Sequence, residues 1–212
     1  MANRLKSLLP DIITEHQPTF TKNRIISDNI LIAFETFHCM KSHNLAETGY
    51  MTLKLDMSKT YDKVEWVFLE NPMRKMGFCE RWIGLIMTYV KSITHSIQVN
   101  GEPKRLITPT RGIRQGDPLS PFLFLLCTER LHALINNAAN FGEITRFSLC
   151  RKGPKLTHLL FADDSLLFCR ATIEECATML NTLETYKNAS GQKVNRNKTT
   201  LFFSESTYED MH

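Results

Sequence analysis

Several familiar sequence signals are missing from this chain of 212 residues. Its six cysteines form no C-x-x-C pair and no Cys/His cluster at zinc-ligand spacing, which excludes the common zinc modules. Residues 1–13 lack the apolar core of a signal peptide, and no later apolar stretch approaches the roughly 20 residues that span a bilayer. We therefore expect a soluble protein of the nucleus or cytoplasm that is not secreted, contacts no membrane and keeps most cysteines as reduced, buried thiols.

The chain also lacks repeats, low-complexity tracts, long linkers and a strong excess of charge. Its 26 Lys and Arg against 22 Asp and Glu give a net charge of +4. Such a charge suits an anionic partner but is equally common in proteins that never bind nucleic acid. A hydrophobic content of 42% allows one sizeable core or two small ones. Composition therefore permits a folded enzyme and does not identify one.

Apolar residues recur at helical spacing in several segments. Asp28 is a candidate N-cap, Pro118 a candidate first residue, Thr172 and Glu175 a candidate capping box, and Gly191 a candidate C-terminal cap. The pattern predicts helices over residues 28–40, 82–90, 118–135 and 172–190.

Other segments alternate in the manner of strands. Residues 50–56 predict a strand that ends on Asp56, and residues 96–99, followed by Asn100-Gly101, predict a hairpin. Two further strands are expected at residues 156–161 and 166–169. The fold class is therefore α+β.

Adjacent carboxylates, Asp163 and Asp164, lie between these last two apolar segments. Burying an unpaired charge is costly and like charges repel, so something must neutralise the pair. Because successive strand side chains point to opposite faces, both acids serve one site only if the chain turns between them. A solvated β-turn, in which Asp is favoured, is the alternative.

Asp56 supplies a third carboxylate at the end of an apolar strand. Two-metal phosphoryl transfer uses carboxylates from separate strands to hold two cations about 3.5–4 Å apart. Three acids on two strand ends meet that need. The alternative for Asp56 is a helix N-cap, since residues 57–63 can begin a helix, and one residue can fill both roles.

A third segment, residues 111–121, combines glycines with positive charge. Gly112 and Gly116 allow backbone to approach a ligand closely, and a following helix presents free N–H groups at its start. The alternative is a charged loop before a proline-started helix. Beside the two acidic segments, ligand binding is the better interpretation.

Three motifs, in order, resemble the palm motifs of reverse transcriptases: LDMSKTYD (residues 55–62), RQGDPLSP (114–121) and FADD (161–164). GQKVNRNK (191–198) is similar to the segment that follows them in LINE-type elements, and residues 17–29 resemble the fingers segment that comes first. The chain thus resembles the reverse transcriptase domain of a plant LINE-type (non-LTR) retrotransposon.

The resemblance implies a right-hand polymerase, with a fingers portion over residues 1–50 and a palm portion over residues 51–212 whose antiparallel sheet is backed by helices. Because the sequence stops at His212, we expect no thumb. It implies an RNA-directed DNA polymerase that transfers a nucleotide from a dNTP to a primer 3′-hydroxyl under two Mg²⁺ ions, for which Mn²⁺ can substitute. The implied partners are an RNA template, a DNA primer and a dNTP. Template binding through backbone phosphates should weaken as salt rises.

The resemblance also assigns roles to single residues. Asp56, Asp163 and Asp164 would bind the metal ions, with the Met57 carbonyl as a further ligand. Tyr61 would lie under the nucleotide sugar and disfavour a ribose 2′-hydroxyl, a core aromatic being the alternative. Gln115 and Gly116 would line the nucleotide site, and Arg24 would contact the triphosphate. Lys198 would lie near the leaving pyrophosphate as a proton donor. For Arg24 and Lys198, the alternative is a solvated cation with no such role.

Several positions depart from the family pattern. Residues 20–24 lack a small, glycine-containing turn, Thr60 replaces an alanine, and Pro72 falls in a predicted helix, where proline costs about 3 kcal/mol or kinks the helix. Two other functions therefore stay open: a catalytically inactive retroelement relic acting at most as an RNA-binding module, and a metal-dependent phosphotransferase or nuclease. Tyr61 and Gln115-Gly116 argue against a nuclease, which needs no deoxynucleotide pocket.

Overall fold

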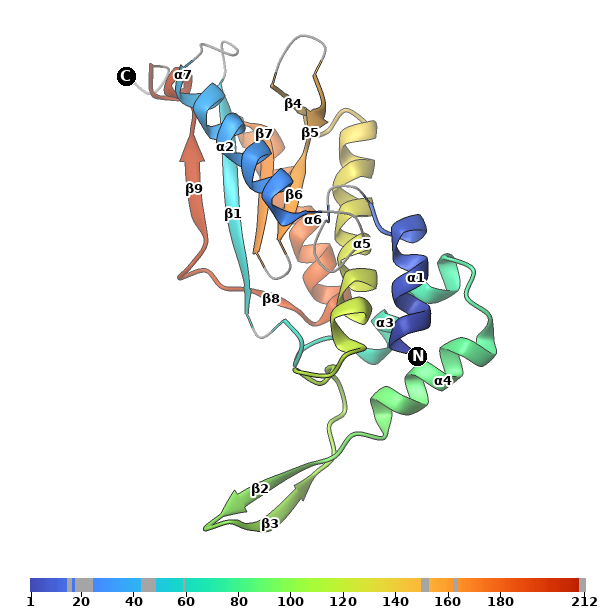
Figure 1. The fold of residues 1–212 in the computed structure, drawn as a ribbon. Helices are drawn as coiled ribbons and strands as arrows, with labels where there is room; N and C mark the ends of the chain where they lie inside the picture. The colour runs from blue at the N-terminus through green and yellow to red at the C-terminus, as the bar shows by residue number, and fades with distance from the viewer. Residues whose placement is uncertain are drawn as a thin grey trace.

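The computed structural model describes residues 1–14, 17, 25–42, 49–58, 60–149, 153–161 and 164–209, which form the α+β arrangement of helices and antiparallel strands in Figure 1. The helices are α1 (Ala2–Ile12), α2 (Ile26–Ser42), α3 (Trp66–Lys75), α4 (Glu80–Lys91), α5 (Ser120–Asn140), α6 (Ile173–Ser190) and α7 (Glu205–Glu209). The strands are β1 (Tyr50–Ser58), β2 (His95–Val99), β3 (Glu102–Ile107), β4 (Phe147–Ser148), β5 (Lys155–Leu156), β6 (His158–Phe161), β7 (Asp164–Arg170), β8 (Lys193–Val194) and β9 (Thr200–Phe203). Within the described ranges, no helix combines the length and apolar character needed to cross a membrane.

Five strands form the central sheet, and every pairing within it is antiparallel. β7 lies between β6 and β1, while β8 and β9 pair with β1 along its other edge. The predicted strand at residues 50–56 is confirmed, and it continues to Ser58, with Met57 opposite Val194. Asp56 therefore lies inside a strand, and its interpretation as a helix N-cap is wrong because β8 extends the pairing of β1 past it.

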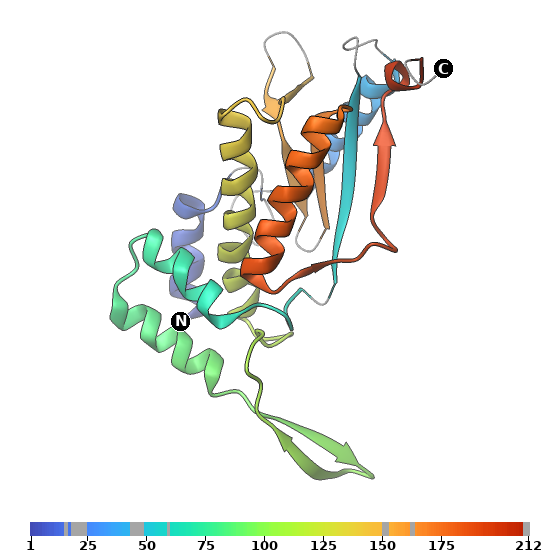
Figure 2. The same cartoon turned by 180° about the vertical axis from the view of Figure 1, so that it is seen from behind.

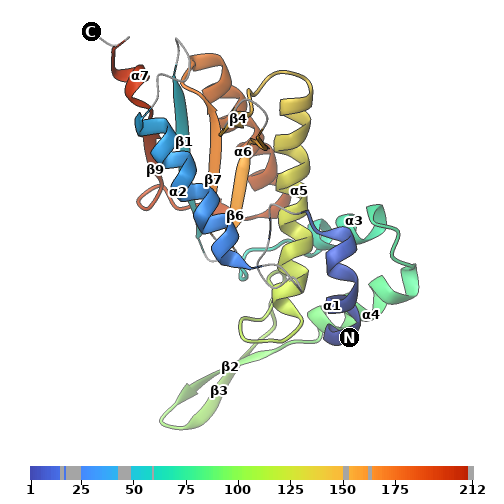
Figure 3. The ribbon, with the colours of Figure 1, turned by 45° about the horizontal axis from the view of Figure 1, so that its top comes forward.

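Helices cover both faces of this sheet (Figures 1 and 3). α2 packs on one face, where Leu166 and Phe168 of β7 contribute to a small core. Seen from behind, α5 and α6 cover the opposite face (Figure 2). The β1 side chains that enter the larger core on that side are Met51, Leu53, Leu55 and Met57. Because strand side chains alternate, Asp56 points to the face that carries α2.

The predicted hairpin is formed by β2 and β3. Asn100 and Gly101 connect the strands with φ values of 53° and 83°, the positive pair that a tight type I′ turn requires. Every residue of both strands is exposed, and the hairpin projects away from the remainder of the chain (Figures 1 and 2).

Two predicted helix starts are wrong by two residues. α2 begins at Ile26, so Asp28 lies in the first turn and is not the N-cap. α5 begins at Ser120 instead of Pro118, because Asp117 Oδ1 accepts a hydrogen bond from Leu119 N at 2.8 Å and holds this segment as a turn.

The predicted cap of α6 is confirmed in part. Glu175 N donates to Thr172 Oγ1 at 3.2 Å, as in a capping box. The Glu175 carboxylate accepts instead from Arg170 N and Thr145 N, both at 2.9 Å, so it fastens neighbouring segments to the helix start.

Pro72 does not interrupt α3, which continues from Trp66 to Lys75. A proline at this position removes one hydrogen bond to the Phe68 carbonyl, at a cost of about 3 kcal/mol. Phe68, Leu69 and Met73 are buried on the same helix. Each contributes roughly 1.5–3 kcal/mol, so packing outweighs the missing bond.

The cysteines among the described residues differ in burial, which affects the protonation of their thiols. The buried ones are Cys39, Cys127 and Cys169, whereas Cys79 is exposed, Cys176 is half-buried and Cys150 lies outside the described residues. Burial raises the pKa of the Cys127 and Cys169 thiols to about 12, which keeps both protonated at neutral pH.

Glycine follows both α5 and α6 in the left-handed conformation, with φ 78° at Gly142 and 74° at Gly191. Gly191 is the predicted C-terminal cap. A Cβ at Gly191 would lie 2.5 Å from the Lys63 carbonyl oxygen, whereas a Cβ at Gly142 would meet nothing within 4 Å.

We expect Gly191→Ala to lower the free energy of unfolding more than Gly142→Ala does. Both substitutions incur the left-handed cost of about 1–2 kcal/mol. Only Gly191→Ala adds a backbone clash, worth a further 1–3 kcal/mol or so. Urea unfolding followed by circular dichroism measures both, and equal losses would contradict the close contact with Lys63.

Tyr186 of α6 is 1% exposed and packs edge-on against Phe68, with ring centroids 5.7 Å apart. Its hydroxyl donates to Gln192 Oε1 at 2.6 Å. Burial raises the pKa of Tyr186 well above its usual value near 10. The protonated phenol therefore stabilises the fold below about pH 10, and that contribution is lost as the pH rises toward the folded-state pKa.

Tyr186→Phe should consequently reduce stability at pH 7, by about 1–3 kcal/mol, because it leaves Gln192 Oε1 buried without this donor. Above pH 10 the variant should lose stability less steeply than the wild type, by up to about 1.4 kcal/mol per pH unit. Urea unfolding between pH 7 and 11 tests both effects; parallel pH curves would argue against a buried, protonated Tyr186.

Candidate active site

Two of the three predicted acids face each other. Asp56 of β1 and Asp164 of β7 are directly opposite in the antiparallel ladder, so their side chains share one face of the sheet. Asp163 lies outside the described residues. Like charges placed opposite one another destabilise a sheet, and a cation is needed to offset them.

Lys198 supplies positive charge beside this pair. Its Nζ lies 3.7 Å from Asp56 Oδ2. The Lys198 side chain is 70% exposed, so solvent screens the contact strongly. Asn195 N donates to the Asp56 carbonyl at 2.8 Å, which ties the segment carrying Lys198 to β1. The structure thus brings Lys198 to the acids, while Arg24 lies outside the described residues.

The chemistry of the donor atoms suits a hard divalent cation, because such ions prefer carboxylate and carbonyl oxygens. Among the described residues, no group of three or more His, Cys, Asp or Glu side chains is placed to hold a metal. Asp56 and Asp164 provide two carboxylates on one face. The Met57 carbonyl oxygen, which has two lone pairs, accepts a hydrogen bond from Thr60 Oγ1 at 2.9 Å.

Tyr61 follows these residues and is half-buried. Its ring stacks on Phe124 of α5, with centroids 5.3 Å apart and planes 25° from parallel. It packs against the main core. The core-aromatic interpretation is therefore compatible with the structure, and the contact with Phe124 leaves the sugar-contact prediction open.

The segment after Tyr61 is held on one side by the predicted arginine-glycine loop. Gly112 N donates to the Val64 carbonyl at 2.8 Å, and the Gly112 carbonyl accepts from Trp66 Nε1 at 2.8 Å. Gly112 has φ 91°, and a Cβ there would lie 2.7 Å from the Asp62 carbonyl. The close approach predicted for Gly112 is thus made to its own chain.

The same segment is held on its other side by residues 190–192. Glu65 N donates to the Ser190 carbonyl at 2.9 Å, and Gln192 Nε2 donates to the Thr60 carbonyl at 3.0 Å. Residues 60–66 therefore join two motifs that are distant in sequence.

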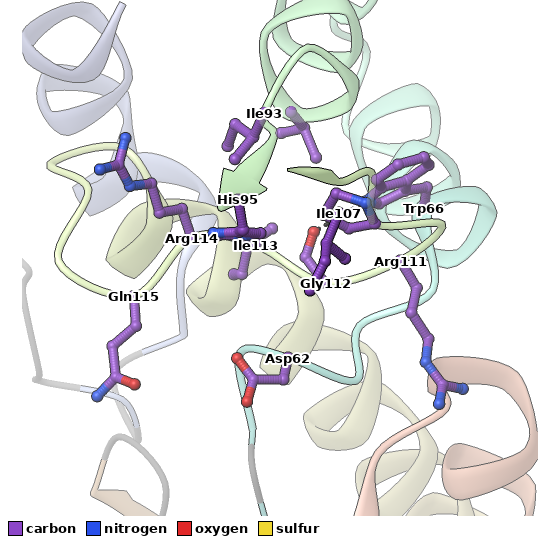
Figure 4. A pocket seen from close by; sticks show the side chains of 12 residues that line it. Asp62, Trp66, Ile93, His95, Ile107, Arg111, Gly112, Ile113, Arg114 and Gln115 are labelled. Atoms are coloured by element: carbon purple, nitrogen blue, oxygen red, sulfur yellow. Dashed lines mark hydrogen bonds between the residues drawn. The ribbon is translucent and has the colours of Figure 1, made fainter. Parts of the chain in front are cut away.

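A cavity of about 430 Å³ opens beside this junction (Figure 4). Its lining includes Asp62, Arg111 and Gln115, together with His95 and Ile107 from the base of the hairpin. In Figure 4, Gln115 and Arg111 lie on either side of Asp62, and the Arg114 guanidinium is directed away from it.

The structure separates the predicted site residues into two groups. Gln115 lines this cavity, whereas Asp56 and Asp164 are not among its lining residues. Gly116, with φ 84°, has no atom of the described residues within 4 Å of the place a Cβ would take.

Tyr89 of α4 anchors the other end of this loop. Its hydroxyl donates to Asp117, which is buried and belongs to the predicted motif. This hydrogen bond raises the pKa of Tyr89 above its usual value. Sequence patterns gave no reason to single out Tyr89, Trp66 or Gln192, because each acts through a contact with a distant segment.

Comparison with known proteins identifies one family for this chain. The family model described as "Reverse transcriptase (RNA-dependent DNA polymerase)" matches residues 1–209. An uncharacterized mitochondrial protein of Arabidopsis thaliana is 51% identical over 67 residues, which cover 32% of this chain and 55% of that protein. A Pol polyprotein from the type-1 retrotransposable element R2 of Popillia japonica is 30% identical over 130 residues, 61% of this chain and 20% of that protein.

Solved structures show the same fold at low sequence identity. Apo telomerase from Candida tropicalis, truncated from its C-terminal domain, superposes with a TM-score of 0.64 at 13% identity, covering 96% of this chain and 39% of that one. The chain spans about half or less of the length of these relatives. The match over residues 1–209 shows that this chain belongs to the reverse transcriptase family.

Proposed function

We propose that this chain carries out RNA-directed DNA synthesis, in which a primer 3′-hydroxyl attacks the α-phosphate of a dNTP and pyrophosphate leaves. The observation that supports it most directly is the pair of carboxylates, Asp56 and Asp164, opposite each other on adjacent strands. In this proposal, residues 1–50 are a fingers portion and residues 51–212 a palm portion.

Asp56, Asp163 and Asp164 would hold two Mg²⁺ or Mn²⁺ ions, with the remaining lone pair of the Met57 carbonyl as a further ligand. When bound, such ions activate the attacking hydroxyl and stabilise charge on the leaving pyrophosphate. Asp56 and Asp164 share one face of the sheet because β1 and β7 pair in register. Lys198, whose Nζ lies 3.7 Å from Asp56 Oδ2, would give a proton to the leaving pyrophosphate.

The nucleotide would lie against Tyr61, Gln115 and Gly116, with Arg24 at its triphosphate. Support comes from the open surroundings of Gly116 and from Gln115 in the cavity lining. Tyr61, stacked on Phe124, offers a rigid ring against which a 2′-hydroxyl would clash.

The proposed macromolecular partners are an RNA template and a DNA primer. A telomerase from Candida albicans with the same fold was solved in complex with a fragment of telomeric RNA. That relative is only 14% identical, so it supports the fold and leaves RNA binding by this chain to experiment.

An inactive relic is the main alternative. The uninterrupted α3 removes one reason for it, because Pro72 does not break the helix. The altered residues 20–24 lie outside the described residues.

Primer extension on a poly(rA) template with an oligo(dT) primer tests the proposal. With Mg²⁺ or Mn²⁺, the wild type should extend the primer, and Asp56→Asn, Asp163→Asn and Asp164→Asn should each reduce the rate at least about 100-fold. A carboxylate that holds a catalytic cation contributes several kcal/mol, and each tenfold in rate corresponds to about 1.4 kcal/mol.

Asp11→Asn is the matched control, since Asp11 is exposed on α1, away from the acid pair. Circular dichroism should first show that every variant is folded. If a folded wild type extends no primer, the polymerase proposal fails and the relic becomes the better description; equal activity in all four variants would exclude the assigned acids.

A second variant probes the proposed sugar contact. Tyr61→Ala should raise the incorporation of ribonucleotides relative to deoxyribonucleotides, by about 10–200-fold, because one steric contact discriminates over that range. Single-nucleotide extension with dTTP and UTP gives kcat/KM for each. An equal loss for both nucleotides would show that Tyr61 serves only as a core aromatic.

A further inference from the structure

Gln192 is an amide in a place where an apolar side chain would pack at less cost. It is 1% exposed, and burying an amide is unfavourable unless its polar atoms are bonded. Both ends of the amide do find partners: Nε2 donates to the Thr60 carbonyl at 3.0 Å, and Oε1 accepts from the Tyr186 hydroxyl at 2.6 Å. The side chain therefore spans from α6 to the turn that follows β1.

Tyr186 determines which way this amide points. A phenol carries one proton, and its hydroxyl lies 2.6 Å from Gln192 Oε1 but 3.4 Å from the Cys127 carbonyl. Donation to Gln192 fixes the oxygen toward Tyr186, so the NH₂ group must face Thr60. Because Tyr186 is 1% exposed and packed against Phe68, this orientation is locked.

The Thr60 carbonyl belongs to the peptide group immediately before the Tyr61 Cα. The carbonyl immediately after that Cα, Tyr61 O, accepts from Ile113 N at 2.9 Å. Two peptide planes that flank one Cα determine its φ and ψ and hence the direction of its Cα–Cβ bond. Gln192 and Ile113 thus hold the two peptide groups that flank the Tyr61 Cα, which orients its side chain. Phe124 supports the face of the Tyr61 ring.

We propose that Gln192 is a positioning residue that aims Tyr61 and thereby sets the preference for deoxyribonucleotides over ribonucleotides. The inference rests on the proposed polymerase function. Gln192 touches no substrate in this scheme; it acts through the Thr60 carbonyl.

The test compares Gln192→Met, which keeps the length of the side chain but cannot donate, with Asn137→Met, the same kind of change at an exposed position of α5. Hydrogen exchange by mass spectrometry is the first readout and needs no catalysis. Peptides covering residues 57–65 should exchange about two- to tenfold faster in Gln192→Met, the range expected for one lost hydrogen bond, and unchanged in Asn137→Met.

Sugar selectivity is the second readout. The ratio of kcat/KM for dTTP over UTP should fall about two- to tenfold in Gln192→Met, mainly through KM. In a Tyr61→Ala background the same substitution should leave the ratio unchanged, because both act through one ring. If Gln192 were merely structural, Gln192→Met would lower kcat/KM for dTTP and UTP by the same factor. Its effect would then add to that of Tyr61→Ala.

The outcomes separate the two proposals. If the wild type extends no primer, the polymerase function fails and the selectivity role fails with it, while the exchange rates still decide whether Gln192 holds this turn. If the wild type is active and Gln192→Met retains wild-type exchange and selectivity, the positioning role is overturned and the polymerase stands.

Discussion

The antiparallel pairing of β1 with β7 determines both which β1 side chains enter the main core and where Asp56 and Asp164 lie. The register that turns Leu53 and Leu55 into the main core turns Asp56 to the other face, opposite Asp164. A slip of one residue would send every β1 side chain to the wrong face, removing leucines from the main core and burying a carboxylate there. Burial of an unpaired charge costs several kcal/mol, so hydrophobic packing enforces the geometry of the polar pair.

The second constraint is the set of backbone and side-chain hydrogen bonds that hold residues 60–66. Residues 60–66 contact the arginine-glycine loop on one side and residues 190–192 on the other, and glycine stands where each approach is tightest. Gly112 and Gly191 are needed because a Cβ would press on a carbonyl oxygen of residues 62 or 63. Residues 60–66 are thus held both by backbone groups and by the side chains of Trp66 and Gln192.

Strands, turns and helix caps that depend on neighbouring residues were the features best predicted from the sequence. Alternation over residues 50–56, the Asn100-Gly101 turn and the caps at Thr172 and Gly191 each depend on a few neighbouring residues, and each is confirmed. The errors have different causes: a local hydrogen bond from Leu119 N to Asp117 delays the start of α5, and core packing carries α3 through Pro72. Gln192 belongs to a motif identified from the sequence, but its hydrogen bond was not predicted because its partner Thr60 is 132 residues away and no local pattern encodes such a bond.

The central position of β1 also has a consequence during synthesis. β1 is made early, but the strands that pair with it, β7, β8 and β9, come from the last part of the described chain. Ribosomes add about 5–20 residues per second, so both edges of an apolar strand stay unpaired for several seconds. High contact order of this kind slows folding and leaves strand edges open to pairing with other chains.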